Sequence, residues 1–147
     1  MKTLVIIPCG KSKVWDRYPK AGPVPARLAY VGTPFKVNRA YAERVGSSWL
    51  ILSAKYGFIS PDFVISGPYE VSFKHPETNP VAAAKLRRQA NRIEGFDRII
   101  GIGGAEYRET MRDAFEPVVV EFPFAGLSIG KMMQAVKKAT PLKGFWA

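Results

Sequence analysis

The chain has 147 residues, of which 47% are hydrophobic, and this length suits one compact domain spanning residues 1–147. Its 22 Lys and Arg residues outnumber its 12 Asp and Glu residues, and the formal net charge of +10 favours a nucleic-acid or phosphorylated partner, with a solvated basic surface as the simpler alternative. The single cysteine excludes an intrachain disulfide, and no apolar run approaches the ~20 residues needed to cross a bilayer, which excludes a membrane-spanning protein.

The first apolar run, Leu4 to Pro8, predicts a strand, and the motif PCGKSK begins where that strand ends. Gly10 permits close approach of a ligand, while Lys11, Lys13 and Arg17 supply positive charge, a combination that suits a phosphate. The loop lacks the spacing of a Walker A motif, so nucleotide hydrolysis is not favoured. Alternatively, the proline and the glycine simply end the strand.

Cys9 lies in the same loop. The neighbouring lysines would suit a nucleophilic thiol, but a small buried hydrophobic residue is the more ordinary interpretation. A lone cysteine, and a single lysine after Met1 that is too little for a secretory signal, lead us to expect a cytoplasmic protein. The one histidine, His75, is interpreted as a surface residue, and no metal or other cofactor is expected.

Two connections, residues 9–34 and 54–79, are much longer than the usual few residues. Both contain many aromatic residues, and we therefore expect them to be ordered. Between them, residues 35–45 are expected to form a helix and residues 48–53 a second strand.

The second strand leads into SAKYGFISPD. Lys55 and Tyr56 follow the strand directly, Asp62 follows a turn, and Tyr69 and Glu70 come further along. Cations, a flat ring and a carboxylate are what a pocket for an everted base requires. The alternative is structural: Tyr56 and Phe58 seal the end of the sheet, and Asp62 caps a turn.

The second half of the chain repeats the alternation of helix and strand. A helix is expected over residues 80–93, with Pro80 in its first turn and Thr78 or Asn79 as its cap. The further elements are a strand over 97–103, a helix over 104–115, a strand over 117–122 and a helix over 128–139 capped by Ser128. The tail, with Phe145 and Trp146, either packs back on the domain or frays.

Glycine-bearing loops also follow the third and fourth of these strands. Gly104 begins a helix whose amino end could hold an anion, with Tyr107 and Arg108 close by. Gly126 lies in the loop FPFAGLSIG. Alternating strands and helices predict a three-layer α/β/α sandwich with a four-stranded, mostly parallel sheet. In such sheets ligands bind at the carboxyl ends of the strands, where all four loops would meet.

The motifs PCGKSK and WLILSAKYG, the following PD and PYE, and the closing GLSIG resemble those of a family of uncharacterised bacterial and phage domains, over nearly the whole chain. In strand order and loop placement this domain is similar to the uracil-DNA glycosylase superfamily, and it looks like the anti-phage DNA glycosylases that remove modified bases from viral DNA. That superfamily's Gly-x-x-Pro-Tyr and His-Pro-Ser loops are replaced here by PCGKSKVWD and FPFAGLSIG. Its leaving-group histidine therefore has no counterpart in this sequence.

The loops and the resemblance together predict a DNA glycosylase that cleaves the N-glycosidic bond of a modified base, such as a hypermodified phage base, and leaves an abasic site. This reaction builds positive charge on the sugar and negative charge on the base. The carboxylate near the sugar would be Asp16, Asp62 or Glu70, with Asp62 slightly preferred. The expected DNA-binding residues are Lys11, Ser12, Lys13 and Lys55, with Trp15 and Tyr56 stacking on bases. No membrane or obligate protein partner is expected.

Three alternatives remain open from the sequence. A lysine could attack the sugar carbon as a Schiff-base nucleophile, which would add strand cleavage. The same loops would suit a nucleosidase, phosphorylase or transferase acting on a free nucleotide. They would also suit a nucleic-acid-binding module without catalysis.

Overall fold

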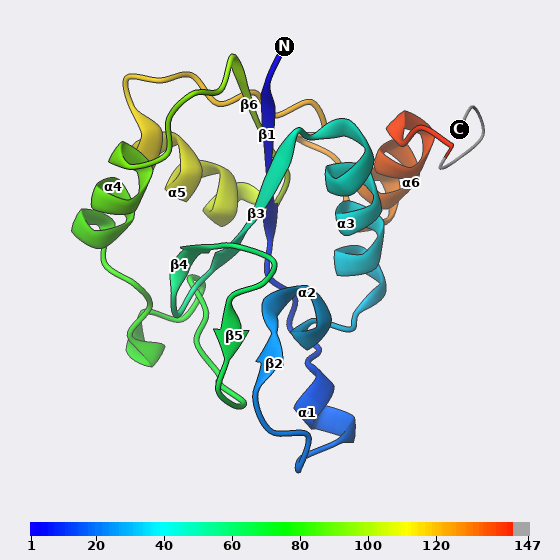
Figure 1. The fold of residues 1–147 in the computed structure, drawn as a ribbon, viewed down its shortest axis with the longest axis vertical. Coiled ribbons are helices and arrows are strands. Elements are labelled where there is room, and N and C mark those ends of the chain that lie inside the picture. The colour runs from blue at the N-terminus through cyan, green and yellow to red at the C-terminus, as the bar shows by residue number, and fades with distance from the viewer. Residues whose placement is uncertain (143–147) are drawn as a thin grey trace.

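The computed structural model describes residues 1–142, which form an α/β fold around a four-stranded sheet (Figure 1). The strands lie in the order β4-β3-β1-β6, and β1 (Thr3–Pro8), β3 (Ser48–Ser53) and β6 (Arg98–Gly101) are parallel. The edge strand β4 (Gly57–Ile59) pairs antiparallel with β3, so the sheet is mixed. One face is covered by α3 (Thr33–Val45) and α6 (Ile129–Ala139), and the other by α4 (Ala83–Asn91) and α5 (Ala105–Phe115) (Figure 1).

The central strand β1 contributes to a core on each face of the sheet. Val5 and Ile7 belong to the core beneath α3 and α6, whereas Leu4 and Ile6 belong to the core beneath α4 and α5. All four side chains are buried, and burial of each stabilises the fold by roughly 1.5–3 kcal/mol. Because both faces are covered, the strand is an unbroken apolar run rather than an alternating one.

The strand expected over residues 117–122 is wrong. Only Glu121 pairs with the sheet, through an isolated parallel bridge to Ile100. Val118 and Val119 are 55% and 79% exposed, and Pro117 has no N–H to donate to a strand. The fourth strand is instead β4, in a segment that the sequence suggested was loop, because pairing with β3 buries Phe58 and Ile59.

The four expected helices are present, but the start expected for the helix over residues 80–93, with Pro80 in its first turn and Thr78 or Asn79 as its cap, is wrong. Residues Pro76–Thr78 form a short 3-10 helix, η1, and Asn79 has a left-handed φ of 60°, so α4 begins later, after Ala82. Ser128 does occupy the N-cap position of α6, although its side chain makes no capping hydrogen bond.

The two long connections are ordered, as expected. The first contains α1 (Val14–Arg17), β2 (Val24–Pro25) and α2 (Ala26–Ala29), and the second contains β5 (Val64–Ile65), which pairs with β2 in a small second sheet. Trp15, Tyr30 and Tyr69 from these connections are buried in the core beneath α3 and α6. Phe145 and Trp146 lie outside the described residues.

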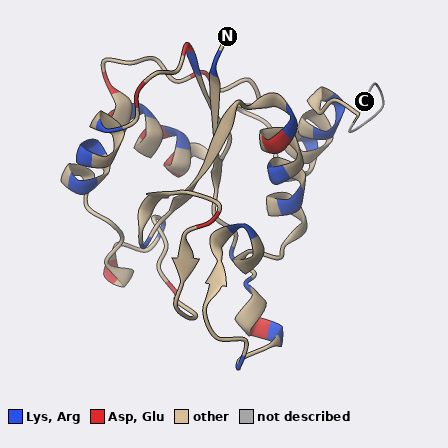
Figure 2. Cartoon of the chain, viewed as in Figure 1, with Lys and Arg blue, Asp and Glu red and all other residues tan. Residues whose placement is uncertain are grey.

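The excess of positive charge is spread over the helices. Figure 2 shows Lys and Arg residues on α3, α4 and α6, with fewer acidic residues among them. Within residues 1–142, no helix has the length and apolar character needed to cross a membrane.

Candidate functional site

The candidate site lies where the three parallel strands end. Cys9 follows β1 directly, and its N–H donates to the carbonyl of Leu52 over 3.0 Å, which extends the ladder between β1 and β3. Ser53 is the last residue of β3, and Tyr107 lies in the first turn of α5, after β6. The parallel topology therefore gathers residues from three strand ends at one edge of the sheet.

Buried hydroxyl groups connect the end of β3 to both long connections. The Tyr69 hydroxyl is hydrogen-bonded to the Tyr30 hydroxyl and, over 3.0 Å, to Ser53 Oγ. Ser53 Oγ also accepts the backbone N–H groups of Lys55 and Tyr56, each over 3.2 Å. The chain of hydroxyls thus fixes the turn that presents Lys55 and Tyr56.

Cys9 extends this cluster toward α5, because its Sγ lies 3.3 Å from the Tyr107 hydroxyl. Burial, followed by the nearby Cys9 thiol, raises the pKa of Tyr30, Tyr69 and Tyr107 well above the usual value for tyrosine. The three phenols are therefore neutral at physiological pH and can donate hydrogen bonds. The cluster formed by Cys9, Tyr30, Ser53, Tyr69 and Tyr107 is called the phenol cluster below.

Two lysines add positive charge to the phenol cluster. Lys13 Nζ lies 4.7 Å from the centroid of the Tyr69 ring, and Lys55 Nζ lies 5.5 Å from the same centroid. Lys55 Nζ also lies 5.2 Å from the centroid of Tyr56. Such cation–π contacts stabilise an ammonium group but leave most of its hydrogen-bond donors available.

Lys13 is the more unusual of the two, since only 9% of its surface is exposed. The first loop is pinned to the end of α2 by a bridge between Lys13 and Tyr30, and the ammonium donates to the carbonyl of Lys11 over 3.2 Å. Among residues 1–142, neither Lys13 nor Lys55 forms an ion pair with a carboxylate. A buried cation without a counter-ion favours binding of an anion.

The aromatic residues frame the cluster but leave few open faces. Tyr56 packs edge-on against Tyr69, with the ring centroids 5.6 Å apart, and against Phe63 at 5.1 Å. Trp15 is 4% exposed and donates its indole N–H to the carbonyl of Gly22 over 2.9 Å. Trp15 therefore supports the first loop from the core, whereas Tyr56 retains partial exposure for a base.

The three carboxylates singled out in the sequence lie outside the phenol cluster. Asp16 accepts the backbone N–H of Lys13 over 2.8 Å and so caps α1. Asp62 is 85% exposed and forms a 2.8 Å ion pair with Arg27. Glu70 is exposed, forms no ion pair with any described residue, and follows Tyr69 directly.

The remaining sequence candidates lie around the same edge or beyond it. Lys11 and Ser12 are exposed in the first loop, where Gly10 packs beside Tyr30 and Phe35. Gly104 is the N-cap residue of α5. The guanidinium of Arg108 donates to the Gly103 carbonyl over 3.0 Å. Gly126 lies in an exposed turn before α6.

Three residues of the site were not singled out in the sequence. Ser53 and Tyr30 join the phenol cluster through tertiary contacts that no local pattern indicates. Gly103 has a φ of +151°, and a Cβ there would lie 2.7 Å from the Cβ of Tyr107. The glycine pair after β6 was a signal for this position, because such pairs allow a helix to begin close to a strand end.

Comparison with known proteins places the chain in a family. It is 40% identical over 150 residues to the uncharacterized protein YfjM of Bacillus subtilis (strain 168), covering 97% of this chain and 98% of that protein. No solved structure matches. Residues 4–138 match the family of unknown function DUF6884, and the chain therefore belongs to that family.

Proposed function

We propose that the protein is a DNA glycosylase that cleaves the N-glycosidic bond of a modified base and leaves an abasic site. The observation that carries this proposal is the pair of ammonium groups, Lys13 and Lys55, on the ring of Tyr69 at the edge of the phenol cluster. In N-glycosidic cleavage the electron pair of the bond leaves with the base, so cations and neutral donors at the base lower the barrier.

The reaction also requires a group that directs water to the sugar. Hydrolysis breaks the bond between C1′ and the base nitrogen, water supplies the new oxygen on C1′, and one of its protons ends on the base. We assign Glu70 to orient this water, because Asp62 is engaged by Arg27 and Asp16 by the backbone of Lys13. A carboxylate there would also stabilise positive charge on the sugar.

The likeness to the uracil-DNA glycosylase superfamily is part of the proposal. It is supported by the location of the phenol cluster at the carboxyl ends of parallel strands, where that superfamily's loops lie. His75 is exposed and its Nδ1 lies 3.3 Å from Glu77, so the lysines would replace a histidine at the departing base. Hypermodified phage DNA is the substrate class that the resemblance favours.

The test is base release from duplex and single-stranded DNAs that carry normal, uracil or hypermodified bases. We expect free base by mass spectrometry and alkali-labile sites in one DNA and not in the others. Glu70→Gln is expected to abolish release while DNA binding is retained, whereas Glu109→Gln, a matched change at an exposed position of α5, is expected to leave release unchanged. Release of no base from any of these DNAs would contradict the proposal.

A nucleic-acid-binding module without catalysis is the second candidate. Among residues 1–142, no carboxylate forms an ion pair with Lys13 or Lys55. This observation favours a binding module, because a binding site for phosphates needs only the cations. In that case DNA is bound without release of a base, and Glu70→Gln leaves binding unchanged or strengthens it.

A further inference from the structure

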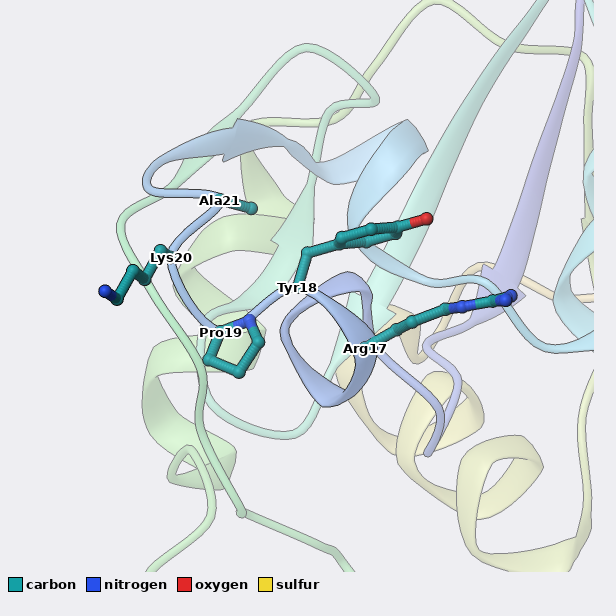
Figure 3. Close-up of a pocket in the computed structure, with 5 residues that line it drawn as sticks. All are labelled: Arg17, Tyr18, Pro19, Lys20 and Ala21. Carbon is teal, nitrogen blue, oxygen red and sulfur yellow. The ribbon is translucent and has the colours of Figure 1, made fainter.

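We propose that Arg17, Tyr18 and Lys20 form a second contact for nucleic acid, in which Tyr18 stacks on an unpaired base next to the target and the two cations bind flanking phosphates. This inference rests on the proposed action on nucleic acid, and it adds a specific platform outside the phenol cluster. These residues line a shallow hollow together with Pro19 and Ala21 (Figure 3).

Tyr18 is exposed in a way that suits stacking. It is 60% exposed, and among the Phe, Tyr and Trp residues of the described chain the next most exposed is Phe63, at 38%. Figure 3 shows the Tyr18 ring and the Arg17 side chain extending in the same general direction, with Lys20 pointing the opposite way. A base on the ring would therefore have a cation on either side, which matches the phosphates that flank every nucleotide.

The backbone around Tyr18 is fixed before any ligand binds. Its N–H donates to the carbonyl of Val14 over 2.9 Å, and its carbonyl accepts the N–H of Ala21 over 3.0 Å. Gly22 then takes a left-handed φ of +73°, and its carbonyl accepts the indole N–H of Trp15 over 2.9 Å. A preformed turn needs little further ordering when a base stacks on it, which favours binding.

The same short helix connects this turn with the candidate site. Lys13 is the N-cap residue of α1 and carries its ammonium to Tyr69, whereas Tyr18 is the C-cap residue. The four residues of α1 span roughly 6 Å, so the loop that carries Lys13 and the turn that carries Tyr18 are only about one helical turn apart along the backbone. A strand with one base at the phenol cluster could thus reach Tyr18 with a neighbouring base.

The charge at this turn is not neutralised by the protein. Among the described residues, neither Arg17 nor Lys20 forms an ion pair. The one acidic residue beside them in sequence, Asp16, is hydrogen-bonded to the backbone of Lys13. Arg17 and Lys20 are therefore available to phosphates.

Binding of a fluorescein-labelled oligothymidylate, on the order of ten nucleotides long, tests the platform by anisotropy at several salt concentrations. We expect Tyr18→Ala to weaken binding about tenfold with little change in the salt dependence, and Tyr18→Phe to bind within about twofold of the unchanged protein. Replacing Arg17 and Lys20 together by alanine is expected to reduce the slope of log K against log salt by about 1.4, or ~0.7 for each phosphate contact. Lys138→Ala, on α6, is the charge control and is expected to leave the slope unchanged.

The outcomes separate this inference from the proposed function. If the unchanged protein binds the oligonucleotide and Tyr18→Ala binds equally well, the platform is wrong and the proposed function stands. If the unchanged protein binds no nucleic acid even at low salt, both are wrong. Thermal unfolding serves as the folding control for Tyr18→Ala. The exposed Tyr18 side chain makes no hydrogen bond to any described residue, so its removal should leave the melting temperature unchanged. A loss of binding with an unchanged melting temperature supports the platform.

Discussion

The ammonium group of Lys13 lies 4.7 Å from the ring centroid of Tyr69, and this contact holds a nearly buried cation without a carboxylate partner among the described residues. An arrangement of this kind costs stability, because the desolvated charge is only partly compensated. A buried lysine that costs stability, such as Lys13, is expected where the function of the protein requires its charge.

Lys13→Met should separate stability from function. The substitution keeps most of the apolar stem and removes the buried charge, so we expect the free energy of unfolding to stay constant or to rise by about 1 kcal/mol. Binding of DNA should weaken about tenfold, because one charge-assisted contact is lost. Urea unfolding and anisotropy measure the two effects, and Lys36→Met on the exposed surface of α3 is the control. A loss of several kcal/mol would instead identify Lys13 as a structural residue.

The hydroxyl of Tyr69 should stabilise the site through its two partners. Tyr69→Phe keeps the ring for both lysines but leaves the hydroxyl groups of Tyr30 and Ser53 without this partner. We expect a loss of ~1–3 kcal/mol in the free energy of unfolding, measured in urea. Tyr18→Phe, which changes an exposed ring, is expected to cost nothing measurable. Equal stability of the two variants would show that the hydroxyl chain does not contribute.

Gly103 should be required for the position of Tyr107. A Cβ at Gly103 would meet the Cβ of Tyr107 at 2.7 Å, whereas Gly126 has a φ of +81° and open space around it. Gly126→Ala is expected to cost ~1–2 kcal/mol for its left-handed backbone, and Gly103→Ala a further ~1–3 kcal/mol for the overlap. Chemical unfolding of both variants measures the difference, and equal losses would mean that α5 shifts without strain.

The sequence predicts those elements of the fold that a local apolar pattern determines, but not those that depend on pairing with a distant segment. Leu4 to Pro8 could be identified as a central strand because both of its faces are apolar. Residues 117–122 look similar in sequence, but Pro117 and the exposed Val119 show that apolar composition alone does not create strand pairing. β4 was missed because its three residues form a strand only through β3.

In the candidate site, too, some residues could be predicted from the sequence and others could not. The motifs predict that Lys13 and Lys55 lie at one edge of the sheet, because strand ends of a parallel sheet coincide, and the structure places both beside Tyr69. Ser53 and Tyr30 could not be predicted, since their hydrogen bonds depend on how the long connections fold. Tertiary contacts likewise decide that Trp15 faces the core rather than a ligand.

Alkaline pH should destabilise the protein through its buried phenols. Burial raises the pKa of Tyr30, Tyr69 and Tyr107, so the folded state favours the neutral form. This contribution to stability is fully present below the usual tyrosine pKa of 10.0 and is lost as the pH rises above that value. At a pH of ~10.5 we expect less tyrosinate absorbance from the native protein than from the chain in denaturant. Identical absorbance in the two states would contradict burial of these hydroxyls.

Acidic pH should weaken the contact between β6 and the segment that follows α5. Arg98 makes two hydrogen bonds of 2.9 Å to the carboxylate oxygens of Glu121, and these bonds, together with the charge of Arg98, lower the pKa of Glu121 below its usual value of 4.5. A lowered pKa in the folded state stabilises the protein above that usual value, and the contribution is lost as the pH falls through the lowered pKa. We therefore expect the melting temperature of the unchanged protein to exceed that of Glu121→Gln at neutral pH and the two to converge in acid.

Glu109→Gln, which removes a carboxylate without an ion pair among the described residues, is expected to show no such convergence. A difference between the unchanged protein and Glu121→Gln that persists below the lowered pKa would assign the effect to side-chain packing rather than to charge.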